Sequence, residues 1–205
     1  MESKDICKEI TSLKITLLGK GAVGKTSLVY SFFGSAEANE YEPTIEDSIN
    51  KIEKIDDKDY NLILTDTGGE EDYQNMMDSW ITEGDGFMLV FALNDKQSFE
   101  ALESKVARIQ KYPEKNLALL LVGNKSDLKE SREVTQEEIK RFAKKIKAEY
   151  IETCAISKDN KNVICAVHKV AKLIIKRKDA IFSNPPETLA DFSDKKQGIC
   201  CCNVY

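Results

Sequence analysis

The sequence predicts an α/β fold: a six-stranded, mostly parallel sheet covered by helices on both faces. Six short segments are apolar or alternate between apolar and polar residues, which is typical of strands. Longer segments between them repeat apolar residues at spacings of three and four, the pattern of amphipathic helices. One pair of strands is separated only by a short polar turn, so one edge strand is expected to be antiparallel.

Six strands are expected. In chain order the segments are Leu13–Leu18, Ser48–Ile55, Tyr60–Thr65, Gly86–Leu93, Asn116–Val122 and Tyr150–Thr153. The second and third flank the polar turn Asp56–Asp59 and form a hairpin. The fourth and fifth are apolar almost throughout, as strands buried on both faces are.

The helices are predicted from periodicity and capping. They are Lys25–Phe33, Asp95–Lys111, a helix that begins at Thr135, and Asn162–Arg177. Glu138 follows Thr135 by three positions, the spacing of a capping box. Ligands of such sheets bind at the carboxyl ends of the strands. The loops after Leu18, Thr65, Val122 and Thr153 should therefore hold the chemistry.

Length and composition indicate one domain, residues 10–178, followed by a polar tail, residues 179–205. The chain has 205 residues, 41% hydrophobic and 32% charged, with a formal net charge of −5. That charge gives no reason to expect nucleic acid as a partner. No apolar run approaches the ~20 residues of a membrane-spanning helix, and the charged N-terminus does not resemble a signal peptide. These features favour a cytosolic protein.

Isolated histidine and cysteine residues offer little chemistry. His168, the single histidine, falls in a predicted helix away from the expected site loops, which argues against histidine catalysis. Cys7, Cys154 and Cys165 lack the spacing of metal ligands or of a disulfide framework. Trp80 is expected to pack near the helix that follows the third strand.

The first loop predicts a phosphate-binding site. Residues 19–26 read GKGAVGKT, which matches G-x-x-x-x-G-K-[ST] between a strand and a helix. Glycines let backbone N–H groups face the phosphates, and the helix N-terminus adds a positive field. Lys25 supplies a charge for the β and γ phosphates, and the Thr26 hydroxyl can bind Mg²⁺. The motif places the chain among the P-loop NTPases without saying which nucleotide it binds.

A second motif indicates guanine. Residues 124–127 read NKSD and follow a buried strand about 100 residues after the P-loop. The Asp127 carboxylate can accept hydrogen bonds from the N1–H and amino group of guanine. Adenine presents an acceptor at N1 and would leave that carboxylate unpaired, which is unfavourable.

With these motifs in order, the chain resembles the Ras superfamily of small GTPases over about residues 10–178. Asp66-Thr67-Gly68-Gly69 resembles the second switch, and Glu152-Thr153-Cys154-Ala155 resembles the loop that meets the guanine oxygen. The segment that resembles the first switch, or effector loop, is Tyr41, Glu42, Pro43, Thr44, Ile45, Glu46, Asp47 and Ser48. It resembles Ras more than Rho proteins, although the P-loop is slightly Rho-like.

The resemblance implies a role for each matching residue. The implied Mg²⁺ ligands are Thr26, Thr44 and Asp66, and the catalytic residues are Glu70, Lys25, Thr44 and Gly69. GTP or GDP would be contacted by Gly21, Ala22, Val23, Gly24, Lys25, Thr26, Ser27, Tyr41, Thr44, Gly69, Asn124, Lys125, Asp127, Cys154 and Ala155. It also implies a monomeric signalling switch that hydrolyses GTP, with effectors, an exchange factor and a GTPase-activating protein as partners.

Departures from the family pattern keep a second reading open. At the position after Gly69, Ras proteins have a glutamine that orients the attacking water during GTP hydrolysis, and Ras is itself the worked example of that mechanism. This chain has Glu70 there instead. A carboxylate can accept a proton but cannot donate to the γ-phosphate. The alternative is a GTP-binding effector anchor that hydrolyses little.

Three other positions also depart from the family pattern. Gly68 replaces an alanine, and Ile156 replaces a lysine that lies over the guanine. An ungapped count puts Glu37 at the position of the aromatic residue that stacks on the base. The loss of that aromatic at Glu37 predicts faster GDP release than in typical Ras proteins. A P-loop kinase or ATPase is disfavoured by the guanine motif.

The C-terminus resembles a lipid-anchored tail. Cys202-Asn203-Val204-Tyr205 fits C-a-a-X in position, although Asn203 and Tyr205 are unusual. Cys200 and Cys201 are candidates for a second acyl chain, which stable anchoring requires. The expected location is the cytoplasmic face of a membrane, and the plasma membrane is the membrane favoured. An unmodified cysteine tail is the alternative.

Overall fold

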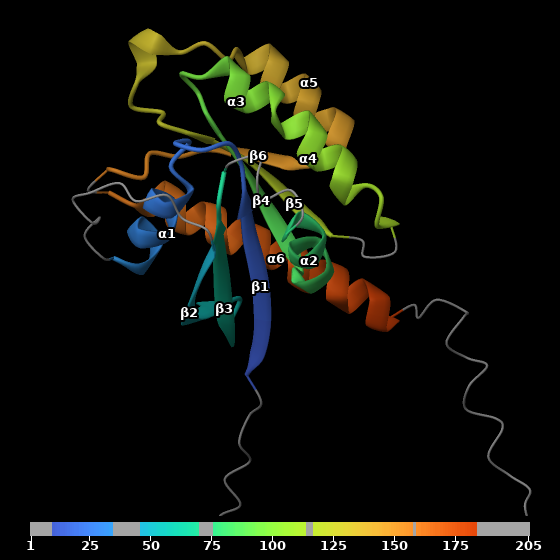
Figure 1. The fold of residues 1–205 in the computed structure, drawn as a ribbon. Coiled ribbons are helices and arrows are strands. Elements are labelled where there is room, and N and C mark those ends of the chain that lie inside the picture. Colours follow the sequence, from blue (N-terminus) through green and yellow to red (C-terminus); the bar gives the residue numbers. More distant parts are fainter. Residues whose placement is uncertain (1–9, 35–45, 70–75, 114–116, 158, 184–205) are drawn as a thin grey trace, which may run out of the picture.

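The computed structural model describes residues 10–34, 46–69, 76–113, 117–157 and 159–183. Within them a six-stranded sheet has the order β2-β3-β1-β4-β5-β6 (Figure 1). The strands are β1 (Thr11–Leu18), β2 (Glu46–Ile55), β3 (Lys58–Thr67), β4 (Gly86–Ala92), β5 (Ala118–Asn124) and β6 (Glu149–Glu152). β2 is antiparallel to β3, and the other neighbours pair in parallel. The predicted fold class is confirmed.

Helices pack on both faces of this sheet. They are α1 (Lys25–Phe33), α2 (Met77–Glu83), α3 (Lys96–Glu100), α4 (Leu102–Ile109), α5 (Gln136–Ile146) and α6 (Lys161–Ser183), with a 3₁₀ turn η3 (Lys129–Ser131). α1 and α6 share one apolar cluster with the sheet, and α2, α4 and α5 share the other. In β4, Val90 faces the first cluster and Leu89 the second. This alternation explains why β4 is apolar throughout.

The hairpin is tighter and longer than the sequence predicted. The turn holds only Asp56 and Asp57, with φ of 46° and 67°, because Ile55 already pairs with Lys58. Two positive φ values fit a type I′ turn, whose twist matches that of paired strands. The polar residues Glu46 and Asp47, expected in a loop, belong to β2. Their extended conformation results from pairing with β3. The prediction missed it because it relied on alternating apolar residues, which this polar segment lacks.

Two helix predictions are corrected as well. The segment Asp95–Lys111 divides into α3 and α4 at Ala101, which stays in the right-handed helical region with φ −60° and ψ −19°. The chain therefore keeps a helical conformation between the two helices. The last helix continues past Arg177 to Ser183, although the charged run of residues 176–179 interrupts the apolar pattern from which its end was predicted. The Thr135–Glu138 capping box is present as predicted.

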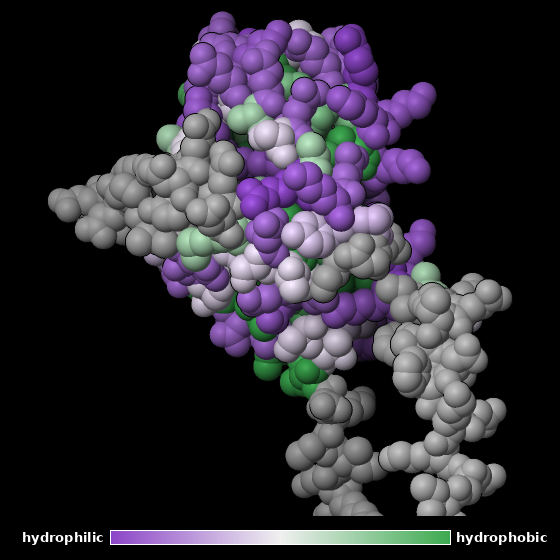
Figure 2. All heavy atoms as spheres, turned by 45° about the vertical axis from the view of Figure 1, so that its right-hand side comes forward, coloured by the Kyte–Doolittle hydropathy of each residue, from purple (hydrophilic) through white to green (hydrophobic). Residues whose placement is uncertain are grey.

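The described surface is mainly polar. The face in Figure 2 is largely hydrophilic, with hydrophobic side chains in small separate groups. Within the described ranges, no helix combines the length and apolar character needed to cross a membrane. Most of the large apolar side chains are instead buried in the two clusters beside the sheet.

Candidate functional site

The phosphate loop follows β1 and leads into α1. Gly24, the N-cap of α1, has φ 92°, and a Cβ there would lie 2.4 Å from Nδ2 of Asn124. Only glycine satisfies both conditions. Ala22 also has positive φ, 60°, which turns the loop back on itself. The backbone between Gly21 and Gly24 therefore forms a turn directly before the positive end of a helix.

Lys25 is buried beneath this loop. Its side chain is held by the carbonyl oxygens of Gly19 and Lys20, with its Nζ donating over 3.2 and 3.1 Å. Burial lowers the pKa of Lys25 to about 8, although the nearby Asp66 carboxylate acts to raise it. A buried ammonium held by neutral oxygens is an anion-binding charge, and a phosphate would restore its pKa.

Two side chains with oxygen atoms that could bind a metal ion lie beside the same loop. The hydroxyl of Thr26 donates to Oδ2 of Asp66 over 2.6 Å, and Asp66 is only 3% exposed. Hydroxyl and carboxylate oxygens are the ligands that Mg²⁺ prefers, with water completing its shell. The pair therefore fits Mg²⁺. No cluster of three or more His, Cys, Asp or Glu residues with metal-binding geometry occurs in the described part of the chain.

The second-switch glycine contacts the phosphate loop directly. A Cβ on Gly69 would lie 2.2 Å from the backbone nitrogen of Gly21 and 2.5 Å from the carbonyl carbon of Lys20. No side chain fits between these backbones. Gly69 therefore lies directly against the phosphate loop, and its role as a γ-phosphate sensor stays a prediction.

Asn124 joins three loops of the site. It is 2% exposed, and its Nδ2 donates to the Val23 carbonyl over 2.9 Å. Its Oδ1 accepts from the hydroxyl of Thr153 at 3.1 Å and from the N–H of Ala155 at 3.3 Å. The phosphate loop, the NKSD motif and the loop after β6 are therefore locked together through one amide.

A small hollow lies beside this junction. It has a volume of about 170 Å³ and is lined by Gly24, Ser27, Asn124, Lys125, Asp127, Leu128, Ala155 and Ile156. The thiol of Cys154 donates to Oδ1 of Asp127 over 3.0 Å, and burial, followed by this carboxylate, raises the pKa of Cys154. Ile156 is 70% exposed at the rim. The Asp127 carboxylate thus lines the hollow and accepts a weak hydrogen bond from the thiol.

Some predicted residues lie in strands and others outside the described structure. Asp66 and Asn124 were expected in loops but belong to β3 and β5, because they pair with Leu17 and Ala92. Glu46, Asp47 and Ser48 open β2. The predicted site residues Tyr41, Glu42, Pro43, Thr44, Ile45 and Glu70, together with Glu37 and Cys200, Cys201 and Cys202, lie outside the described residues.

Three links near the site were not predicted. The indole N–H of Trp80, in α2, donates to Glu46 over 3.0 Å. Arg108 in α4 forms a bidentate pair with Asp78 in α2, both contacts at 2.8 Å. Lys20 reaches Gln97 at 3.2 Å. Each link joins residues at least 30 positions apart, so no local pattern could reveal it.

The comparisons with known proteins agree with this geometry. The Ras family model matches residues 14–176, which include every site element described above. The chain belongs to the Ras family. It is 37% identical over 164 residues to "Ras-like protein RAS2" of Hydra vulgaris, covering 78% of this chain and 83% of the relative.

Two further relatives extend the likeness of this Ras-family chain. It is 34% identical over 194 residues to "Ras-like protein 2" of Drosophila melanogaster, covering 94% of this chain and 98% of that protein. It is 38% identical over 166 residues to "Ras-like protein 1" of Saccharomyces cerevisiae, of which 53% is covered. Family membership makes it a small GTPase of the Ras type.

Proposed function

We propose that this chain binds GTP and GDP together with Mg²⁺ and hydrolyses GTP, acting as a nucleotide-regulated signalling switch. One observation carries the proposal: Asn124 joins the phosphate loop, the NKSD motif and the loop after β6 around one hollow. A phosphate site or a polar turn alone would not need this connection.

Each group has a defined task in this proposal. The Lys25 ammonium and the loop N–H groups bind the β and γ phosphates. Thr26 and Asp66 hold Mg²⁺, which would offset phosphate charge. Asp127 accepts from guanine, while the N–H of Ala155 is placed for the guanine oxygen. Gly69 donates its N–H to the γ-phosphate, so its position depends on whether that phosphate is present.

The chemical step is proposed to involve Glu70, outside the described residues. As a carboxylate it can accept a proton from the attacking water, but it adds a negative charge beside a phosphoryl group whose oxygens gain charge. Thr44 is proposed to hold Mg²⁺ and to sense the γ-phosphate with Gly69. Effectors would then bind residues 41–48 in the GTP state.

Single-turnover hydrolysis tests this function. Purified chain is loaded with GTP, and phosphate release is followed with and without Mg²⁺. Mg²⁺-dependent release of one phosphate per bound GTP supports the proposal. The hydrolysis rate of Glu70→Gln then shows how the carboxylate affects the chemical step. Stable GTP binding without phosphate release supports the second candidate function, an effector anchor. Glu70 is the one sequence feature that favours this candidate. A preference for ATP in competition contradicts both.

Membrane attachment is proposed separately. Cys202 is proposed to carry a prenyl group, with Cys200 or Cys201 acylated, because one chain anchors only marginally. Intact mass of the protein from eukaryotic cells tests this: the lipid mass should disappear in Cys202→Ser. An unmodified mass in the parent protein refutes it. Exchange factors and GTPase-activating proteins are expected as regulators of the same site.

A further inference from the structure

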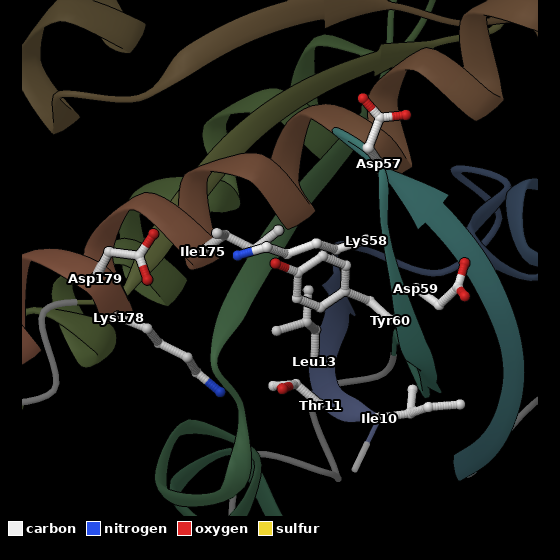
Figure 3. A pocket seen from close by; sticks show the side chains of 10 residues that line it. All are labelled: Ile10, Thr11, Leu13, Asp57, Lys58, Asp59, Tyr60, Ile175, Lys178 and Asp179. Carbon is white, nitrogen blue, oxygen red and sulfur yellow. The ribbon is translucent and has the colours of Figure 1, made fainter. Parts of the chain in front are cut away.

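A hollow of about 510 Å³ lies at the end of the sheet away from the nucleotide site, between α6, the start of β1 and the β2–β3 turn (Figure 3). Three carboxylates and two lysines line it, and one of these lysines, Lys178, already pairs with Asp85 at 2.9 Å. Charged side chains of both signs around one open space favour no single class of ligand. A more specific arrangement of charged and polar side chains lies at the opposite end of the sheet, beside the phosphate loop.

Lys20, the second residue of the phosphate loop, extends its side chain to the start of α3. Its Nζ donates to Oε1 of Gln97 over 3.2 Å and lies 3.9 Å from Oδ2 of Asp95. Asp95 is the N-cap of α3, and Gln97 belongs to the first turn of that helix. The side chain of Lys20 therefore connects the loop after β1 to the loop after β4.

The start of α3 is itself held by several contacts. Oδ1 of Asp95 accepts from the N–H of Ser98 over 3.0 Å, which caps the helix. Ser98 is fully buried, and its hydroxyl accepts from the N–H of Ala92, at the end of β4, over 3.0 Å. Lys96 donates to Glu138 of α5 over 2.9 Å, and this carboxylate raises the pKa of Lys96. A side chain bonded to this segment is thus held relative to β4 and α5.

The backbone of Lys20 contacts two residues of the proposed nucleotide site. Its carbonyl oxygen accepts from Nζ of Lys25 over 3.1 Å. A Cβ on Gly69 would lie 2.5 Å from its carbonyl carbon, so the backbones of Lys20 and Gly69 are in direct contact. A movement of the Lys20 peptide would therefore displace both the ammonium of Lys25 and the backbone of Gly69.

We propose that Lys20 is a positioning residue for the γ-phosphate, an assignment that rests on the function proposed above. Its bond to α3 fixes the Lys20 peptide, and this peptide in turn fixes Lys25 and Gly69 relative to the bound nucleotide. Lys25 serves the β and γ phosphates, whereas Gly69 serves the γ-phosphate alone. Loss of the bond should therefore weaken GTP binding and hydrolysis more than GDP binding, because displacements of about 1 Å already slow reactions strongly.

A different role for Lys20 is a direct effect of its charge on the phosphates. The amide of Gln97 and the carboxylate of Asp95 hold the ammonium at α3, which favours positioning over a direct effect. The two roles separate when the partners of Lys20 are removed and its charge is retained. Asp95→Asn/Gln97→Leu does this, because asparagine still caps a helix.

Single-turnover GTP hydrolysis and competition binding of GDP and a non-hydrolysable GTP analogue, both with the full chain, test the assignment. In Lys20→Met, hydrolysis and the ratio of analogue to GDP affinity should each fall about three- to tenfold, as expected when an exposed contact positions reacting groups. Lys20→Arg retains the charge and the donors and should restore both to within about twofold of the parent.

The partner variants and a control complete the experiment. Asp95→Asn/Gln97→Leu should reproduce the loss seen in Lys20→Met, and adding Lys20→Met to it should cause little further loss, because both changes remove the same contact. Lys145→Met is the matched control. It breaks an exposed 2.9 Å pair with Glu103, between α5 and α4, and should leave both readouts unchanged.

The outcomes distinguish this assignment from the proposed function. A parent-like rate and affinity ratio in Lys20→Met overturns the assignment, as does a loss in Lys20→Met that is absent from Asp95→Asn/Gln97→Leu. Equal losses of analogue and GDP affinity, with a lower midpoint of thermal unfolding, indicate general loosening of the loop and also overturn it. A parent protein that binds the analogue without hydrolysing GTP contradicts the proposed hydrolysis, whereas the affinity ratio still tests Lys20.

Discussion

Replacing Asn124 by alanine tests whether one amide holds the nucleotide site together. The change removes three hydrogen bonds, of 2.9, 3.1 and 3.3 Å, from a side chain that is 2% exposed. It leaves the Val23 carbonyl, the Thr153 hydroxyl and the Ala155 N–H without this partner. At about 1 kcal/mol net for each bond, the loss is on the order of 3 kcal/mol.

This energy sets the expected change in nucleotide release. A loss of 1.4 kcal/mol is a factor of ten, so ~3 kcal/mol corresponds to roughly a hundredfold if it falls wholly on the bound state. Part of it will instead appear as lower folding stability, so we expect GDP release to accelerate about 10- to 100-fold. The assay is the release of a fluorescent GDP analogue into excess GDP. Thermal unfolding of the same samples measures the remaining share.

Two further variants sharpen the Asn124 experiment. Asn124→Asp retains the acceptor towards Thr153 and Ala155 but places a carboxylate oxygen against the Val23 carbonyl, so release should again accelerate. Asn50→Ala is the matched control, because Asn50 makes only an exposed 3.3 Å contact with Asn61 on the sheet surface. Release within threefold of the parent in Asn124→Ala, with unchanged unfolding, would refute the assigned role.

Other predictions concern the phosphate loop and the second-switch helix. Burial lowers the pKa of Lys25 to about 8, and bound phosphate favours the charged form of the lysine. Nucleotide affinity should therefore fall by up to about tenfold per pH unit as the pH rises above ~8. An affinity that does not change between pH 7 and 9 in competition titrations would contradict this. Gly69→Ala should retain GDP binding but lose hydrolysis at least tenfold, because its Cβ would lie 2.2 Å from the Gly21 nitrogen; unchanged single-turnover rates would show that the loops separate freely. Trp80→Phe should destabilise the chain by about 1–2 kcal/mol in urea unfolding through loss of the 3.0 Å bond to Glu46, and an equal loss in a Glu46→Ala background would exclude that bond as the cause.

Much of the fold was predictable because strands and helices leave local periodic signals. The six strands and the amphipathic helices follow from spacings of two, three and four residues. The Thr135–Glu138 capping box was likewise a local pattern, and both its hydrogen bonds are present. Boundaries were less predictable. Glu46 and Asp47 lie in β2 through pairing with β3, and polar residues carry no strand signal of their own.

The site was predictable in its motifs and not in its connections. The P-loop and the NKSD motif show residue types at fixed spacing, and from them Lys25, Thr26 and Asp127 are predicted directly as binding residues. The bond between Cys154 and Asp127, at 3.0 Å, joins positions 27 apart. Nothing local in the sequence indicates that the thiol orients that carboxylate. The contact arises only because β5 and β6 are parallel neighbours, so the loops that follow them lie at the same edge of the sheet.

The sequence by itself determined the order of elements and the residue types available for phosphate, magnesium and guanine. Those properties depend on near neighbours along the chain. The tertiary structure alone decided that Asn124 fastens three loops, that Gly69 touches Gly21, and that a hollow opens beside α6. Each depends on where strands distant in sequence come to lie in one sheet, and packing of the whole core, not local preference, sets those positions.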